Sequence, residues 1–152
     1  MDGQLLTVRV GEFLFGAPVA AVTEILADTK VMPIPRTPPT VAGVVVVRGQ
    51  ALTVLTLRPT LGLTRAPVHL ALRWGGHRGT SLIAVDAVNG LWNPVDPLPD
   101  EQWQRMVPPA MVGLVESGYR WASEWLWAWA EDLPDRLQDA MLGASDAEGR
   151  WS

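Results

Sequence analysis

Short apolar runs, each ended by glycine or proline, recur along most of this sequence and restrict the folds open to it. The clearest runs cover residues 5–10, 41–47, 51–57, 68–74 and 80–85. In the first run alternation puts Leu6, Val8 and Val10 on one face, which is typical of a half-buried strand. Short runs spaced roughly 8 to 12 residues apart favour a β-sandwich or small barrels over alternating α/β structure. We therefore predict an all-β fold.

Valine dominates the strongest of these runs, Val41–Val47. A nearly continuous apolar run is typical of a strand covered on both faces, so we predict a buried central strand. The segment Arg48-Gly49-Gln50 predicts a turn, and residues 51–57 resume as a second strand, which together indicate a β-hairpin. A final hairpin is expected to turn at Ser117-Gly118.

Two stretches have helical spacing. Residues Val19–Leu26 repeat apolar side chains along one helical stripe and follow Pro18, which suits a first helical position. Residues Glu131–Met141 repeat apolar side chains at four-residue intervals and predict a helix near the end of the chain. We assign residues 5–142 to one domain and expect the small, polar residues 143–152 to form a disordered tail.

The charge distribution excludes several classes of function. The net charge is −4 and Lys30 is the single lysine, so the basic clusters expected of a nucleic-acid surface are absent from the sequence. The chain contains no cysteine, which removes thiolate chemistry, and its amino terminus carries Asp2 where a signal peptide would be basic. The apolar run at 41–47 is far shorter than the roughly 20 residues of a spanning helix. We expect a cytoplasmic protein that is not inserted in the membrane.

Candidate catalytic and metal-binding residues are few. His69 and His77 alone do not supply the ligands of a metal site, and Gly75–Gly79 lacks the phosphate-loop pattern. Ser81, His77 and Asp86 could be named as a triad, but no nucleophile elbow accompanies them. We therefore predict no catalytic residue, no bound metal and no cofactor.

Tryptophans crowd the region before the predicted C-terminal helix, at Trp121, Trp125, Trp127 and Trp129. Their spacing fits one helical stripe or one strand face equally well. We favour packing in the core, because indoles bury large areas. An exposed cluster that binds a partner is the alternative, because tryptophan is enriched at interaction hot spots.

An ordered set of short motifs then adds a resemblance. The set comprises Phe13 with Pro18, Val22-x-Glu24-Ile25, Pro35, Val41-x-Gly43-Val44, Arg48-Gly49, Leu57-Arg58, Leu61-Gly62, Val85-Asp86-x-Val88 and Val112-Gly113-Leu114. Over roughly residues 5 to 140, it resembles the CheW-like family of chemotaxis coupling proteins. The resemblance implies two intertwined five-stranded SH3-like β-barrels that share a hydrophobic core, with a C-terminal helix.

The same resemblance implies a non-catalytic adaptor that couples chemoreceptors to a CheA-type histidine kinase. Its expected partners are the regulatory domain of the kinase and the cytoplasmic tip of a receptor. The resemblance assigns partner binding to Glu24, Val44, Val46, Arg48 and Gly49, with Glu24 and Arg48 as a characteristic acid–arginine pair. A glutamate and an arginine can form a two-pronged, charge-assisted hydrogen bond, although spacing alone does not bring these two together.

Departures from the family pattern lie inside its most recognisable stretch. The family usually has Asn-Leu where Val46-Val47 stand, and Pro-Val-x-Asp-Leu where this chain has residues 53–57. These departures keep open a divergent β-barrel interaction scaffold whose partners are neither CheA nor chemoreceptors. A small-ligand-binding barrel is a third hypothesis, which would require a sizeable internal cavity.

Overall fold

The computed structural model describes residues 3–148, and strands account for most of its regular structure. The strands are β1 Leu5–Val10, β2 Phe13–Pro18, β3 Val22–Ala27, β4 Val41–Val47, β5 Gln50–Leu55, β6 Leu70–Gly76, β7 Gly79–Val85, β8 Ala87–Trp92, β9 Val115–Trp121 and β10 Glu124–Trp129. The helices are α1 Asp100–Met106, a short 3₁₀ segment η1 Pro109–Leu114, and α2 Leu133–Glu148. The predicted all-β class with short helices is confirmed.

The strands form two five-stranded sheets built to the same plan. One has the order β8-β1-β2-β10-β9 and the other β3-β6-β7-β5-β4. Each sheet joins two antiparallel hairpins through one parallel pair, β2 with β10 in the first and β7 with β5 in the second. A fifth strand, β8 or β3, adds to one outer side. The two five-stranded units implied by the resemblance are therefore present.

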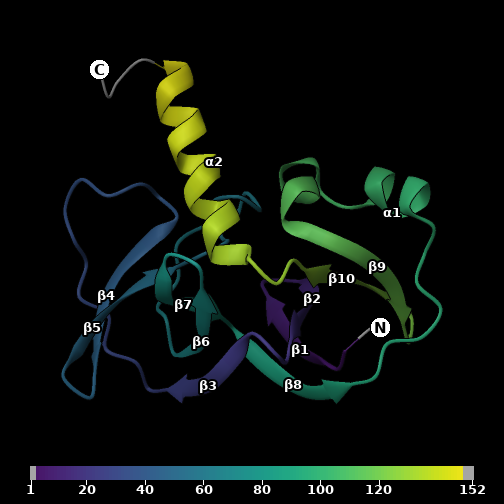
Figure 1. The fold of residues 1–152 in the computed structure, drawn as a ribbon, viewed down its shortest axis with the longest axis horizontal. Helices are drawn as coiled ribbons and strands as arrows, with labels where there is room; N and C mark the ends of the chain where they lie inside the picture. Colours follow the sequence, from purple (N-terminus) through teal and green to yellow (C-terminus); the bar gives the residue numbers. More distant parts are fainter. Residues whose placement is uncertain (1–2, 149–152) are drawn as a thin grey trace.

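The chain enters the first sheet, leaves it for the second, and then returns. Strands β1 and β2 belong to the first sheet, β3 to β7 form the second, and β8 to β10 complete the first. Figure 1 shows the sheets side by side, with β4 and β5 at one end of the molecule and β9 at the other. Helix α2 rises from the region between them. The second sheet is therefore continuous in sequence, whereas the first is completed only after the chain returns from the second.

The largest hydrophobic cluster draws side chains from both sheets. It includes Phe15 and Trp129 from the first sheet, Trp74 and Ile83 from the second, and Leu133 from α2. Smaller clusters lie within each sheet, around Val54 and Leu82 in one and around Leu14 and Leu126 in the other. Burial of large apolar side chains is the main stabilising contribution to such a fold. The shared core is what fixes one sheet against the other.

The predicted helix at Val19–Leu26 is wrong, because residues 22–27 form the strand β3. This strand pairs antiparallel with β6, and alternate residues from Val22 onward are half-buried while those between them are exposed. Its β-branched residues suit a strand, and eight residues form only a marginal helix without tertiary packing. Pro18 ends β2 instead of beginning a helix.

The predicted turn at Ser117-Gly118 is also wrong, since both residues lie inside β9. The β9–β10 hairpin turns at Ala122-Ser123, where Ala122 adopts a φ of 55°. Gly118 serves packing instead: a Cβ atom there would lie 2.8 Å from Trp103 and from the ring of Trp127. A glycine required by close packing has the same sequence signature as one required by a turn.

The C-terminal helix predicted at Glu131–Met141 is present as α2, which begins at Leu133. Leu133 and Leu137 are buried in the shared core, and the indole nitrogen of Trp74 donates a 2.7 Å hydrogen bond to the carbonyl of Glu131 just before it. The helix continues past Gly143 to Glu148. The predicted tail at 143–152 therefore overlaps the helix at 143–148, and it stays a prediction for residues 149–152, which lie outside the described residues.

Candidate partner-binding site

The β4–β5 hairpin turns through two residues in left-handed backbone conformations. Arg48 has a φ of 47° and Gly49 a φ of 83°, between the paired residues Val47 and Gln50. Positive φ at both central positions is the geometry whose twist matches that of the flanking strands. The predicted turn is confirmed. It places Arg48 at the tip of the β4–β5 hairpin.

Arg48 forms a two-pronged hydrogen bond with Glu24 of β3. Its Nη1 donates to Oε2 at 3.0 Å and its Nη2 to Oε1 at 2.7 Å. The Arg48 side chain is 65% exposed and that of Glu24 is 31% exposed. A bidentate pair fixes orientation more firmly than a single contact, while the exposed guanidinium keeps donors available to a partner. The structure thus brings together the two residues that the resemblance paired.

Two neighbouring side chains extend this pair into a small polar network. Arg73 on β6 lies 3.6 Å from Glu24, and its Nη2 donates a 3.2 Å hydrogen bond to the side chain of Gln50. The hydrogen bond from Arg48 lowers the pKa of Glu24, and the same bond raises the pKa of Arg48. Both groups therefore stay charged, and two arginines share one carboxylate. The network carries a net positive charge.

The Glu24–Arg48 contact links the two outer strands of its sheet. Strands β3 and β4 stand at opposite ends of the strand order, so the sheet must curl to bring these side chains within hydrogen-bonding distance. A second link joins Met32 and Val44, which exchange backbone hydrogen bonds of 2.8 and 2.9 Å. Gly43 permits this approach, because a Cβ there would collide with the Met32 carbonyl.

Strand β4 is an outer strand, which corrects the prediction of a central strand buried on both faces. Val45 and Val47 are buried against the cluster around Val54, whereas Val44 is half-buried and Val46 is 56% exposed. Strand β4 pairs along its length with β5 on one side, and on the other side Met32 bonds to Val44, so the rest of that backbone edge is open to solvent. Val44, Val46, Arg48 and Gly49 therefore all belong to one hairpin with an open side.

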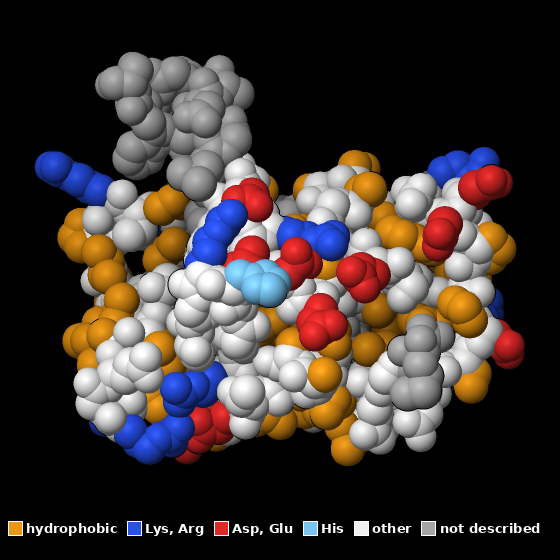
Figure 2. Space-filling model, in the orientation of Figure 1, with side chains coloured by type: hydrophobic (Ala, Val, Ile, Leu, Met, Phe, Trp, Pro, Cys, Tyr) orange, Lys and Arg blue, Asp and Glu red, His pale blue; other side chains and the backbone are white. Residues whose placement is uncertain are grey.

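Apolar side chains also gather on the surface near this hairpin. Figure 2 shows them along the end of the molecule that holds β4 and the loop before it in Figure 1. Among the described residues, the large apolar side chains exposed here include Met32, Ile34 and Val46. Contiguous exposed apolar surface is more typical of an interaction site than of a free protein surface.

A separate groove of about 310 Å³ lies where β3 approaches β8 of the other sheet. Its walls are mainly apolar, and Glu24 stands among them; the lining residues are Leu6, Val19, Val22, Thr23, Glu24, Ile25 and Leu91. Ile25 is 46% exposed and Leu91 is 61% exposed. The Glu24–Arg48 pair therefore lies between two apolar surfaces, the groove and the outer strand.

Sequence reasoning missed Ile25 and Leu91 as surface residues. The predicted helix put Ile25 on a buried stripe with Val22, whereas in β3 these two residues have opposite exposure. Residues 22–27 show no apolar–polar alternation in sequence, so their alternating burial could not be predicted from a local pattern. Nothing local distinguishes Leu91, because its exposure depends on the edge position of β8.

A sequence model described as the CheW-like domain matches residues 4–99, which is more than half of the chain. This chain belongs to the CheW-like domain family. The matched region contains β1 to β8 and therefore the hairpin, the Glu24–Arg48 pair and the groove.

The fold agrees with that of a solved CheW-like structure. The crystal structure of the scaffolding protein TtCheW from Thermoanaerobacter tengcongensis is similar to this chain with a TM-score of 0.66 and 18% sequence identity. The similarity covers 86% of this chain and 90% of the other. No curated protein sequence matches this chain significantly. At this identity the structural likeness supports the fold of the CheW-like domain.

The remaining candidate residues have structural partners. Asp86 accepts hydrogen bonds from Arg58 at 2.9 Å and from the amide of Gly11. The amide of His77 donates to Asp135 on α2, and Ser81 is buried in β7. Within residues 3–148, no group of three or more histidines and carboxylates could hold a metal ion. No helix in this part of the chain is long and apolar enough to span a membrane.

Proposed function

We propose that this protein is a non-catalytic cytoplasmic adaptor that couples chemoreceptors to a CheA-type histidine kinase. Membership of the CheW-like domain family supports this role, as does the likeness to a protein described as a scaffold. The observation that carries the proposal is the Glu24–Arg48 pair, which joins the groove residues on β3 to the turn of the β4–β5 hairpin. One polar network thus connects two surfaces, as expected of an adaptor that binds two partners.

The groove between β3 and β8 is the proposed site for the receptor tip. Exposed Ile25 and Leu91 offer apolar contacts, and a groove of this kind accepts the apolar face of an amphipathic helix. Arg48 and Arg73 beside it carry more positive charge than Glu24 neutralises. A receptor helix that places an acidic or carbonyl group near the network would satisfy the spare arginine donors.

The open side of the β4–β5 hairpin is the proposed site for the regulatory domain of the kinase. Val46 is its exposed apolar residue, with Ala51 and Thr53 also exposed on β5. Outer strands offer both apolar side chains and unpaired backbone groups to another β-rich domain. Val44 and Gly49 would support this surface by holding the strand and its turn.

Pull-down assays with purified partners test the proposal. The protein should retain both the regulatory domain of a CheA-type kinase and a receptor tip fragment from the same organism, alone and together. No binding of either partner at tens of micromolar by a folded protein would contradict it. Binding of neither partner together with capture of a different signalling domain would favour the divergent scaffold instead.

Two matched variants separate the surfaces. Leu91→Asp should abolish binding of the receptor fragment, because a carboxylate in the apolar groove loses hydration without a partner. It should leave kinase binding intact. Val112→Asp is the control, since Val112 is also exposed but lies in η1, away from the groove. Equal receptor binding by the two variants would remove the groove from the proposed site.

A further inference from the structure

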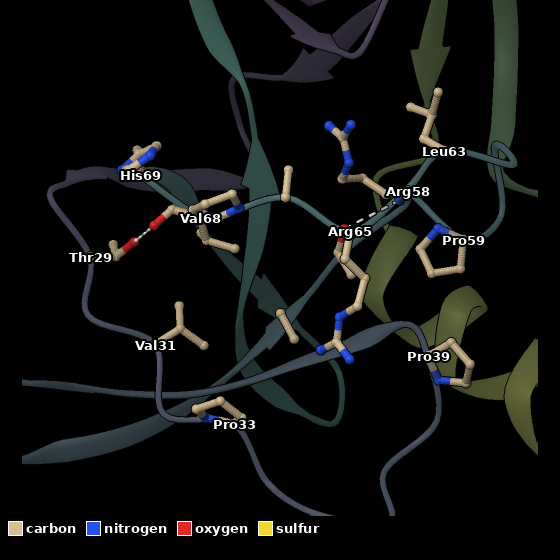
Figure 3. A pocket seen from close by; sticks show the side chains of 14 residues that line it. Thr29, Val31, Pro33, Pro39, Arg58, Pro59, Leu63, Arg65, Val68 and His69 are labelled. Atoms are coloured by element: carbon tan, nitrogen blue, oxygen red, sulfur yellow. Dashed lines mark hydrogen bonds between the residues drawn. The ribbon is translucent and has the colours of Figure 1, made fainter.

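A second cavity, of about 380 Å³, lies apart from both proposed surfaces. It forms between the loop of residues 28–40 that follows β3 and the loop of residues 56–69 that follows β5 (Figure 3). Its volume falls in the range of small-molecule sites, roughly 300–1,000 Å³. Neither the groove at β3 and β8 nor the exposed face of β4 at Val46 contributes to its lining.

Prolines restrict the backbone of the two loops that form this cavity. Four prolines line it, namely Pro33, Pro39, Pro59 and Pro67. Proline fixes its own φ, so these loops lose little further conformational freedom when a ligand binds. Thr29 donates a 3.0 Å hydrogen bond to the carbonyl of Val68, which ties one loop to the other. Val31, Leu63 and Ala42 add apolar surface.

The cationic side chain of Arg65 extends across the cavity in Figure 3. Arg58, the other arginine of the lining, turns its guanidinium away, toward Asp86 at 2.9 Å and the carbonyl of Thr64 at 2.6 Å. For Arg65, by contrast, no ion pair or hydrogen bond is present among the described residues. The described lining also contains no aspartate or glutamate. Arg65 is therefore an uncompensated cation beside apolar walls, in a chain whose net charge is −4.

The surroundings strengthen this local positive charge. An adjoining hollow of about 320 Å³ shares Pro33, Pro39 and Arg65 with the cavity and adds Arg36. The described residues of this hollow include no carboxylate either. Two arginines without acidic neighbours thus face one region of the loops. Their field would attract anions and disfavour cations.

We propose that this cavity binds a small organic carboxylate with an apolar body. Arg65 pairs with the carboxylate through two parallel N–H···O bonds, which a planar guanidinium provides and a neutral ligand cannot use as well. The apolar body packs between the prolines and Val31, and its burial supplies the remaining affinity. Val31 precedes Met32, which pairs with Val44 of β4. A bound ligand therefore stabilises the loop that contains Met32, which is hydrogen-bonded to β4.

Isothermal titration calorimetry with 4-phenylbutyrate and its neutral analogue 4-phenylbutanamide tests the charge requirement. The two probes share an apolar body and differ in the group that would face Arg65. The carboxylate should bind with a dissociation constant in the millimolar range or below, and the amide about tenfold or more weakly. Absence of carboxylate binding, or equal affinity for both probes, would overturn the proposal.

Variants at Arg65 and Arg36 locate the site. Arg65→Gln should weaken 4-phenylbutyrate about tenfold, because it keeps the side-chain length and removes the charge. Arg36→Gln is the matched control, since Arg36 lines only the adjoining hollow, and loss of its longer-range attraction should weaken binding by no more than about twofold. Equal weakening by both variants would mean general electrostatic attraction and contradict a built site. Binding of an acidic, apolar tetrapeptide in place of the carboxylate would assign the cavity to a protein segment.

Discussion

Strands β4 and β10 are both strongly apolar, yet they have opposite places in the molecule. Strand β4 carries four consecutive valines and lies at the outer side of its sheet, with Val46 more than half exposed. Strand β10 carries three tryptophans and lies between β2 and β9, with residues 126–129 buried. From the sequence, the valine run predicted a buried strand, whereas the tryptophans left an exposed partner-binding site as an alternative.

Apolar content thus predicts a strand but not how deeply that strand is buried. Depth depends on how many neighbours the strand acquires, and the parallel pairing of β2 with β10 joins residues more than a hundred positions apart. Trp127 and Trp129 confirm the packing interpretation, whereas Trp125 at 37% exposure stacks with Arg120 on the surface. The same run therefore holds core residues on most of its length and a surface residue at its start.

Removal of a large core side chain should give the largest effect. Trp129→Ala should lower the free energy of unfolding by about 3–5 kcal/mol, measured by urea denaturation. Trp129 is 1% exposed, its ring lies 4.9 Å from that of Phe15 and 6.1 Å from that of Trp74, and its indole nitrogen has no hydrogen-bond partner in the described structure. Its contribution is therefore packing alone.

The corresponding substitution on β4 should have little effect on stability. Val46→Ala should change the free energy of unfolding by no more than about 0.5 kcal/mol in the same measurement, because exposed positions contribute little. A loss at Val46 comparable to that at Trp129 would mean that β4 is covered, and the comparison between the two strands would fail.

Replacement of Gly118 in β9, the neighbour of β10, should have an intermediate effect on stability. Gly118→Ala should lower the free energy of unfolding by about 1–3 kcal/mol, because the added methyl group meets Trp103 and Trp127 at 2.8 Å. Gly113→Ala is the control, since a Cβ there has open space around it. Equal stability of both variants in urea denaturation would show that the tryptophans do not pack against β9.

Two ion pairs near these strands should lose a small stabilising contribution as the pH falls. Hydrogen bonds from Arg48 lower the pKa of Glu24, and those from Arg9 lower the pKa of Glu124 at the start of β10. Each pair therefore stabilises the fold above the ordinary glutamate pKa, and that stabilisation is lost as the pH falls through the lowered folded-state pKa. Since both pairs are partly exposed to solvent, the loss in stability should be small.

Carboxylate titration by NMR checks this prediction. Arg48→Met should raise the pKa of Glu24 toward its ordinary value and leave that of Glu124 unchanged, while Arg9→Met should do the reverse. A pKa of Glu24 that does not respond to Arg48→Met would contradict the two-pronged contact as the cause of the shift.

Local patterns predicted the β4–β5 turn correctly but misplaced the β9–β10 turn, and they predicted long-range placement poorly. The turn at Arg48-Gly49 followed from glycine and a break between two apolar runs, both of which are local signals. The helix predicted at Val19–Leu26 failed because pairing with β6, fifty residues away, outweighs a short helical stripe. The contact between Glu24 and Arg48 came from the family resemblance, since curling of the sheet brings them together. The exposure of Val46, Ile25 and Leu91 likewise depends on sheet edges that no local pattern marks.

We propose that the open side of β4 binds the regulatory domain of the kinase, whereas β10 belongs to the core. Titration calorimetry of the CheA-type regulatory domain against Val46→Asp and Val95→Asp tests it most directly. Val46 and Val95 have nearly equal exposure, 56% and 62%, and both changes place one carboxylate on the surface. Val46→Asp should weaken kinase binding about tenfold or more with unchanged stability, while Val95→Asp should bind normally. Normal kinase binding by a folded Val46→Asp protein would contradict it.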